Sequence, residues 1–146
     1  MGISIYFSAK RPGVPPTPEE TALVRGVFKR ANENWPPERE ALFEVPGMGR
    51  FLLYDLERPL HRGQGKLLDG CAELPLGGRF DALGELLSHW CATFTEVRRQ
   101  LDAPTWSAHL DDHSLAWNEA SKQYALPATA DAAWYRAAVA FVRGGR

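Results

Sequence analysis

Apolar residues follow two different periods along the chain, and the period at each point predicts the local element. Between residues 79 and 101 they recur every three or four positions, which is typical of an amphipathic helix. The apolar positions of this stretch are Phe80, Leu83, Leu87, Trp90, Phe94, Val97 and Leu101. Polar residues such as Asp81, Ser88 and Glu96 fall on the other side. The pattern predicts a long helix that packs one face onto a large apolar surface.

The period changes to two directly after this helix. The apolar residues Trp106, Ala108 and Leu110 alternate with the polar residues Ser107, His109 and Asp111. Such alternation is typical of a strand with one buried face. Asp112, His113 and Ser114 have the composition of a turn, and Leu115 and Trp117 resume the apolar face. We therefore expect a hairpin over residues 106–117, with Trp106 and Trp117 on its buried side.

The first half of the chain predicts a strand, a helix and another hairpin. Alternation from Ile3 to Phe7 indicates a half-buried strand. The run Thr17-Pro18-Glu19-Glu20 provides a cap, a proline at the first helical position and a glutamate three residues after the cap, so it predicts a helix that runs to about Asn32. Residues 42–45 and 50–57 are apolar segments on either side of a Pro-Gly-Met-Gly turn. Residues 50–57 are apolar on both faces, which indicates a central strand.

The remaining segments complete an α+β order. Residues 58–78 are rich in glycine, and only residues 66–74 indicate an irregular or edge strand. Residues 118–128 are polar and loop-like, with the alternative that the strand continues through Tyr124, and residues 129–143 predict a C-terminal amphipathic helix. The order is strand, helix, hairpin, uncertain strand, helix, hairpin, helix. We expect a single α+β domain over residues 1–146, with a largely antiparallel sheet of about five strands packed by about three helices.

Composition narrows the classes of function. The chain has 146 residues, of which 45% are hydrophobic and 24% charged, and its formal net charge is −1. These values are ordinary for a globular domain and indicate neither a nucleic-acid partner nor a membrane. The N-terminus lacks the basic leader and long apolar run of a signal peptide, so we expect a cytoplasmic protein. The abundance of arginine, alanine, glycine and proline suggests a GC-rich bacterial genome.

One cluster has side chains of the kind that bind metals. His109, Asp111, Asp112 and His113 lie in and beside the predicted turn, where three or four of them could converge on zinc, manganese or iron. In a metal-dependent hydrolase, His109, Asp111 and His113 would be the ligands and Asp112 the general base. Asp and Ser also form tight turns by bonding their own backbone, and no HExxH motif accompanies the cluster. A turn without metal is therefore the competing interpretation.

A basic, glycine-containing loop offers a different chemistry. Arg58, Arg62 and Lys66 could hold a phosphate or carboxylate. The loop ends in Gly-Lys like a P-loop, but a P-loop needs glycine at Leu60 and Ser or Thr at Leu67. Nucleotide binding is therefore not indicated. An anion or small ligand held by the three cations stays an alternative to a solvated loop.

The two cysteines are expected to be reduced and mostly buried, because a domain of this size needs no disulfide. His89 and Cys91 are two residues apart on the predicted helix, so their side chains diverge by roughly 200° and cannot form a catalytic dyad. Cys71 could pair with a distant histidine, although a lone cysteine is more often a small apolar filler.

These observations favour a non-catalytic module that binds another protein. The expected contact surface is an acidic hairpin edge around an aromatic residue, formed by Asp102, Asp111, Asp112, Trp117 and Glu119. By analogy, this profile suggests an inhibitor or immunity-type protein. An unpaired strand at the sheet edge could instead mediate a homodimer.

Overall fold

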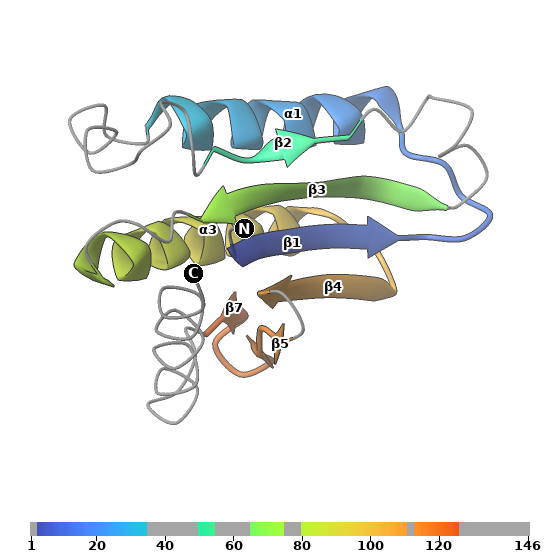
Figure 1. Cartoon of the computed structure of the whole chain (residues 1–146). Helices are drawn as coiled ribbons and strands as arrows, with labels where there is room; N and C mark the ends of the chain where they lie inside the picture. The colour runs from blue at the N-terminus through green and yellow to red at the C-terminus, as the bar shows by residue number, and fades with distance from the viewer. Residues whose placement is uncertain (1–2, 35–49, 55–64, 75–79, 111–112, 126–146) are drawn as a thin grey trace.

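The computed structural model describes residues 3–34, 50–54, 65–74, 80–110 and 113–125. Two helices lie in these ranges, α1 (Pro18–Glu33) and α3 (Phe80–Gln100) (Figure 1). The strands are β1 (Ile3–Lys10), β2 (Leu52–Leu53), β3 (Lys66–Leu74), β4 (Thr105–Leu110), β5 (His113–Ser114), β6 (Trp117–Asn118) and β7 (Gln123–Tyr124). The predicted helix at residues 129–143 and the predicted strand at residues 42–45 lie outside the described residues.

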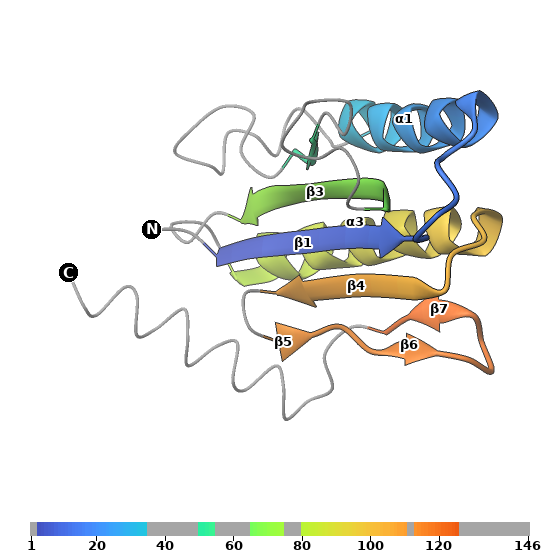
Figure 2. The ribbon, with the colours of Figure 1, turned by 90° about the vertical axis from the view of Figure 1, so that its right-hand side faces the viewer.

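The main sheet has the strand order β2-β3-β1-β4-β5, and every pair of neighbours is antiparallel. The chain runs β1-α1-β2-β3-α3-β4, with β1 and β3 at the centre of the sheet. This connectivity is the split β-α-β arrangement of ferredoxin-like domains. The strands β6 and β7 form a separate hairpin beyond β4, on the side away from α1 (Figure 2). The predicted α+β class with an antiparallel sheet is confirmed.

The N-terminal end of α1 is fixed by the predicted capping box. The Thr17 hydroxyl accepts a hydrogen bond from the Glu20 amide at 3.1 Å, and the Thr17 amide donates to the Glu20 carboxylate at 2.9 Å. The Arg11 guanidinium also donates to this carboxylate, at 2.7 Å. Together these donors lower the pKa of Glu20 to about 2, with Arg11 the largest cause and the Thr17 amide the next. The cap therefore also ties the end of β1 to the start of α1.

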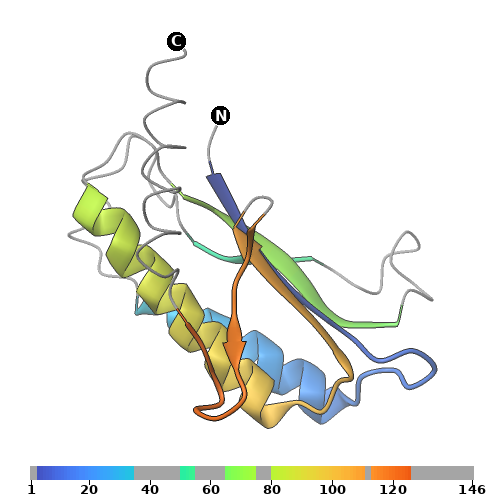
Figure 3. The ribbon, with the colours of Figure 1, turned by 90° about the horizontal axis from the view of Figure 1, so that it is seen from below.

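Both helices cover the same face of the sheet, and the core lies between them and the strands (Figure 3). Phe7 of β1 stacks on Phe94 of α3 with the ring centroids 4.2 Å apart, and Phe28 of α1 stacks on Phe51 at 4.4 Å. Trp90 is fully buried. The predicted apolar face of α3 is confirmed at its buried residues Leu87, Trp90, Cys91, Phe94, Val97 and Leu101.

The middle of the chain differs from its prediction. The strand β3 is a nine-residue central strand between β2 and β1, and not an irregular or edge strand. Gly70 interrupts the pattern of side chains that would have indicated a regular strand. A Cβ at this position would lie 2.5 Å from the Phe51 ring and against the Leu52 carbonyl oxygen. The close approach of β2 requires glycine at this position.

The strand β2 was predicted to be central and is an edge strand of two residues. Its apolar residues do alternate, with Phe51 buried and Leu53 half-buried, whereas Leu52 is 64% and Tyr54 36% exposed. The exposed residues lie on the face of the sheet that the helices leave open. Apolar residues on both sides of β2 therefore do not mean burial on both sides.

The second hairpin is confirmed, but its turn is shorter than predicted. Leu110 pairs with His113 and His109 with Ser114, so His113 and Ser114 belong to β5 and not to the turn. The polar stretch after Trp117 is also not a simple loop. The Asn118 carboxamide oxygen accepts hydrogen bonds from the Ala120 and Ser121 amides, and this turn connects β6 to β7. Trp117 thus belongs to a different hairpin from Trp106, and both tryptophans are partly buried.

Candidate functional site

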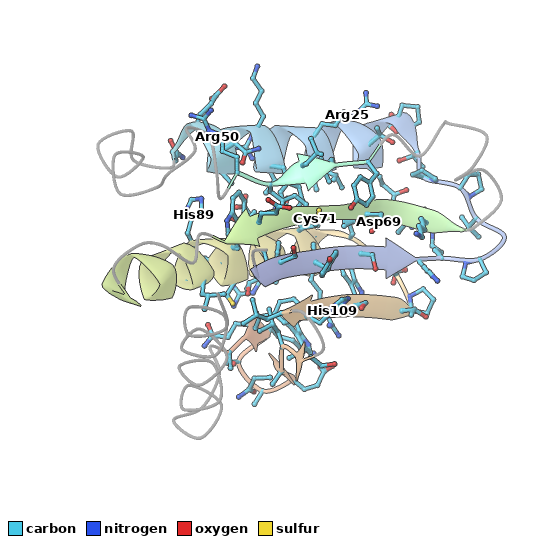
Figure 4. The ribbon with its side chains drawn as sticks, in the orientation of Figure 1. Arg25, Arg50, Asp69, Cys71, His89 and His109 are labelled. Atoms are coloured by element: carbon cyan, nitrogen blue, oxygen red, sulfur yellow. The ribbon has the colours of Figure 1, made fainter. Side chains whose placement is uncertain are left out.

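The face of the sheet opposite the helices carries a row of side chains that crosses four strands. The pairing places Leu52, Cys71, Tyr6 and His109 next to one another on this face. Cys71 and Asp69 on β3 and His109 on β4 lie on the face turned toward the viewer in Figure 4. Serines fill much of the rest of the face, at positions 4, 8 and 107. The row itself contains no carboxylate, lysine or arginine.

Contacts between neighbours give this row a defined shape. The Tyr6 and His109 rings stack with centroids 4.8 Å apart and an interplanar angle of 22°. The Tyr54 hydroxyl lies 3.1 Å from Cys71 Sγ, within hydrogen-bonding distance for sulfur. This hydrogen bond and, next, burial raise the pKa of Tyr54 to about 12. The phenol stays neutral at physiological pH, so Tyr54 adds a polar group without charge.

Charged residues occur at the two ends of the open face. Glu73 is exposed at the end of β3 where it pairs with Ser4, and Lys10 is exposed at the end of β1 where it pairs with Thr105. Lys66 is neutralised by Asp69, since its ammonium lies 2.6 Å from the carboxylate. The open face therefore has an aromatic centre without carboxylate, lysine or arginine, a negative end and a positive end.

The predicted metal cluster is only partly described. His109 stacks on Tyr6, and His113 pairs with Leu110 in β5. Asp111 and Asp112 lie outside the described residues. Among the residues that can be placed, no group of at least three His, Cys, Asp or Glu side chains converges on a common point. The metal site stays a prediction that the structure does not test.

The predicted acidic edge is only partly described. Asp102 is exposed and precedes β4, whereas Asp111 and Asp112 lie outside the described residues. Glu119 forms a 2.5 Å ion pair with Lys122, which lowers the pKa of the Glu119 carboxyl.

Trp117 is the predicted aromatic centre of that edge, and its ring is covered by the guanidinium group of Arg98. The Arg98 guanidinium carbon lies 4.2 Å from the Trp117 ring centroid and 5.5 Å from the centroids of Trp106 and Tyr124. Arg98 also donates a 2.9 Å hydrogen bond to the Tyr124 hydroxyl. This cluster ties the β6-β7 hairpin to α3 and uses the ring face that a basic partner would need.

The remaining predicted groups are the anion loop and the two cysteines, of which the loop is only partly described. Lys66 of the predicted anion loop is paired with Asp69, and Arg58 and Arg62 lie outside the described residues. Both cysteines are free thiols, as predicted; Cys91 is buried, which raises its pKa to about 11. Cys71 and His109 are separated by β1, at roughly two strand spacings or about 10 Å, so they do not form a dyad.

Sequence reasoning missed two features, the open face and a basic pocket between α1 and β2. The signal for the open face was Leu52 and Tyr54, which follow the alternation of the strand but face away from the core. The signal for the pocket was the placement of Arg25 and Lys29 four residues apart, on one side of α1. Both features depend on where β2 lies, which local pattern does not specify.

Comparison of the chain with protein-family models, curated proteins and solved structures gives no match. Among the helices of the described residues, neither is long and apolar enough to cross a bilayer.

Proposed function

We propose that the protein is a non-catalytic interaction module that binds a second copy of itself through the open face of its sheet. The observation that carries this proposal is the row formed by Leu52, Cys71, Tyr6 and His109, which contains no carboxylate, lysine or arginine. A one-sided antiparallel sheet is ordinarily polar on its solvent face. Here that face presents two stacked rings and a leucine that is 64% exposed. Aromatic residues at the centre and charges at the margin are the usual anatomy of a protein interface.

The distribution of charge supports a second copy as the partner. A two-fold axis along the row would reverse the strand direction of the second sheet. The Glu73 end of each copy would then face the Lys10 end of the other, so opposite charges meet twice. The same operation places each aromatic row over its copy. Such a surface is complementary to itself.

The size of the face is sufficient for a weak dimer. The eight residues of β1 span about 26 Å, and four strands are about 19 Å wide, so each copy offers on the order of 500 Å². Two faces together would bury on the order of 1,000 Å², which is the lower bound of a specific interface. We therefore expect a reversible dimer.

Sedimentation equilibrium across a wide range of protein concentration tests this proposal. Leu52→Glu should prevent dimer formation, because it places a carboxylate in the centre of the interface. Val14→Glu is the matched control: Val14 is 53% exposed and lies in the connection between β1 and α1, outside the row. A wild-type protein that stays monomeric throughout, or a dimer equally weakened by both variants, would exclude this surface.

A cross-link provides a second test. In the proposed dimer the two Cys71 side chains lie near the axis, between sheets about 10 Å apart. A short bismaleimide should join them, whereas Cys71→Ser should abolish the product and buried Cys91 should not replace it. A Leu52→Glu protein that cross-links as efficiently as the wild type would contradict the proposed geometry.

The inhibitor or immunity role remains a further proposal, with Asp102, Asp111, Asp112, Trp117 and Glu119 as its suggested residues. No described contact favours it over self-association. The metal-dependent hydrolase is tested by elemental analysis of untagged protein beside His109→Ala. A near-stoichiometric metal that the variant loses would favour the hydrolase.

A further inference from the structure

A pocket of about 520 Å³ lies between α1 and the segment that contains β2. Its α1 wall is formed by residues spaced three or four apart, which share one side of the helix: Arg25, Phe28, Lys29, Asn32 and Glu33. Arg50, Phe51 and Leu53 form the opposite wall. Figure 4 shows Arg25 beside α1 and Arg50 near the C-terminal end of that helix. The volume falls within the usual range for small-molecule sites.

The two walls are held at a fixed separation. The Asn32 side-chain amide donates to the Phe51 carbonyl at 2.9 Å, and its oxygen accepts from the Phe51 amide at 2.8 Å. The side chain thus pairs with the backbone before β2 as another strand would. Beneath it, the buried rings of Phe28 and Phe51 stack. The pocket is therefore built before any ligand arrives.

The α1 wall of the pocket carries an excess of positive charge. Two cations, Arg25 and Lys29, and one acid, Glu33, line this wall, and Arg50 lies on the opposite wall. Arg25 and Lys29 are exposed, and neither has an ion-pair partner in the part of the chain that the structure describes. Like charges at this spacing destabilise a helix slightly. Arg30, which follows Lys29, instead lies 3.8 Å from Glu96 of α3. Arg25 and Lys29 therefore line the pocket, whereas Arg30 lies toward the neighbouring helix.

We infer that this pocket binds a small organic anion with a flat apolar body. Arg25, Lys29 and Arg50 would hold the carboxylate, phosphate or sulfonate group, because guanidinium groups bind such oxygens with two parallel hydrogen bonds. The apolar body would lie against Leu53 and the ring edges of Phe28 and Phe51. The inference is independent of self-association, since Phe28, Phe51 and Leu53 pack on the helix-covered side of the sheet and not on its open face.

Fluorescence titration with 8-anilinonaphthalene-1-sulfonate tests the inference, because this probe has an aromatic body and one fixed negative charge. Arg25→Gln and Arg50→Gln should each weaken binding about tenfold, since a hydrogen bond to a charged group contributes about 1.5 kcal/mol or more. Arg30→Gln removes the same charge from the same helix outside the pocket, and should leave binding unchanged. Arg25→Lys should restore part of the affinity lost in Arg25→Gln.

Competition then defines the ligand class. Phenyl phosphate should displace the probe, whereas benzyl alcohol, which lacks the charge, should not. Inorganic phosphate should compete at least tenfold more weakly than phenyl phosphate; equal competition would refute the apolar part of the assignment. Absence of probe binding, or equal binding by Arg25→Gln and Arg30→Gln, would overturn the site. Circular dichroism of each variant confirms that it is folded, so that lost binding reports on the pocket.

Discussion

Two hydrogen bonds join the Asn32 side chain of α1 to the backbone of Phe51, directly before β2, and their loss should lower the stability of the protein. Replacing Asn32 by alanine removes two hydrogen bonds to the backbone of Phe51, each of which contributes about 1 kcal/mol net. Phe51 is only 4% exposed, so water cannot fully replace the partners that its amide and carbonyl lose in the variant. These unsatisfied backbone groups lower the free energy of unfolding by about 1 kcal/mol more. Alanine has a higher helix propensity than asparagine, which offsets about 0.6 kcal/mol of this loss. The net loss is therefore about 2 to 2.5 kcal/mol.

The assay is thermal unfolding followed by circular dichroism. For a chain of 146 residues, this loss corresponds to a melting temperature lower by roughly 7 °C. Glu33→Ala is the control, because Glu33 is the next residue of α1 and is exposed. A fall of less than about 2 °C for Asn32→Ala, matched by Glu33→Ala, would show that Asn32 does not hold β2.

The variant Asn32→Asp keeps one of the two hydrogen bonds to Phe51 and removes the other, so it tests them separately. The introduced carboxylate can still accept from the Phe51 amide, but it cannot donate to the Phe51 carbonyl and repels that oxygen. Folding therefore favours the protonated form and raises the pKa of the new group. Its destabilisation should be full at neutral pH and should diminish as pH falls through the raised pKa, because the protonated acid donates again. Equal destabilisation at pH 4 and pH 7 would refute this account.

Three shorter predictions concern other contacts. Arg98→Met should lower the free energy of unfolding by about 1 to 2 kcal/mol in urea titration, since it removes the cation above three rings; an unchanged midpoint would contradict that role. The pKa of Glu20 is lowered to about 2, so the wild type should have a higher free energy of unfolding than Glu20→Gln. This difference should be complete above about pH 5 and should vanish as the pH approaches 2. In folded protein at pH 8, iodoacetamide should modify Cys71 well before Cys91, whose thiol is buried, and urea should equalise the two rates.

Local signals predicted the elements that depend on neighbours in sequence. The capping box at Thr17 specified the start of α1, and the apolar spacing of α3 specified its buried face. Alternation identified β1 and β4. Each of these features is decided within about four residues along the chain. The sequence therefore predicted the α+β class and the helix-covered side of the sheet.

The features that failed depend on contacts between distant segments. Gly70 interrupts the apolar pattern of β3 because Phe51 packs at that point, 19 positions earlier in the chain. Arg98 of α3 lies over the Trp117 ring of β6, a contact that the local pattern around Trp117 did not indicate; the acidic surface around Trp117 stays a prediction. The order of strands, which places β2 at the edge, is likewise not a local property. The candidate sites were missed for the same reason.

The two proposed surfaces meet at β2, and this makes them separable by mutation. Leu52 faces the open side of the sheet, and Leu53, the next residue, lines the pocket. Leu52→Glu should prevent self-association and leave probe binding intact, and Arg25→Gln should do the reverse. Asn32→Ala loosens the segment that carries both leucines, so it should weaken both activities in a folded protein. If Asn32→Ala impaired only probe binding, β3 alone would be holding β2 in place on the open face.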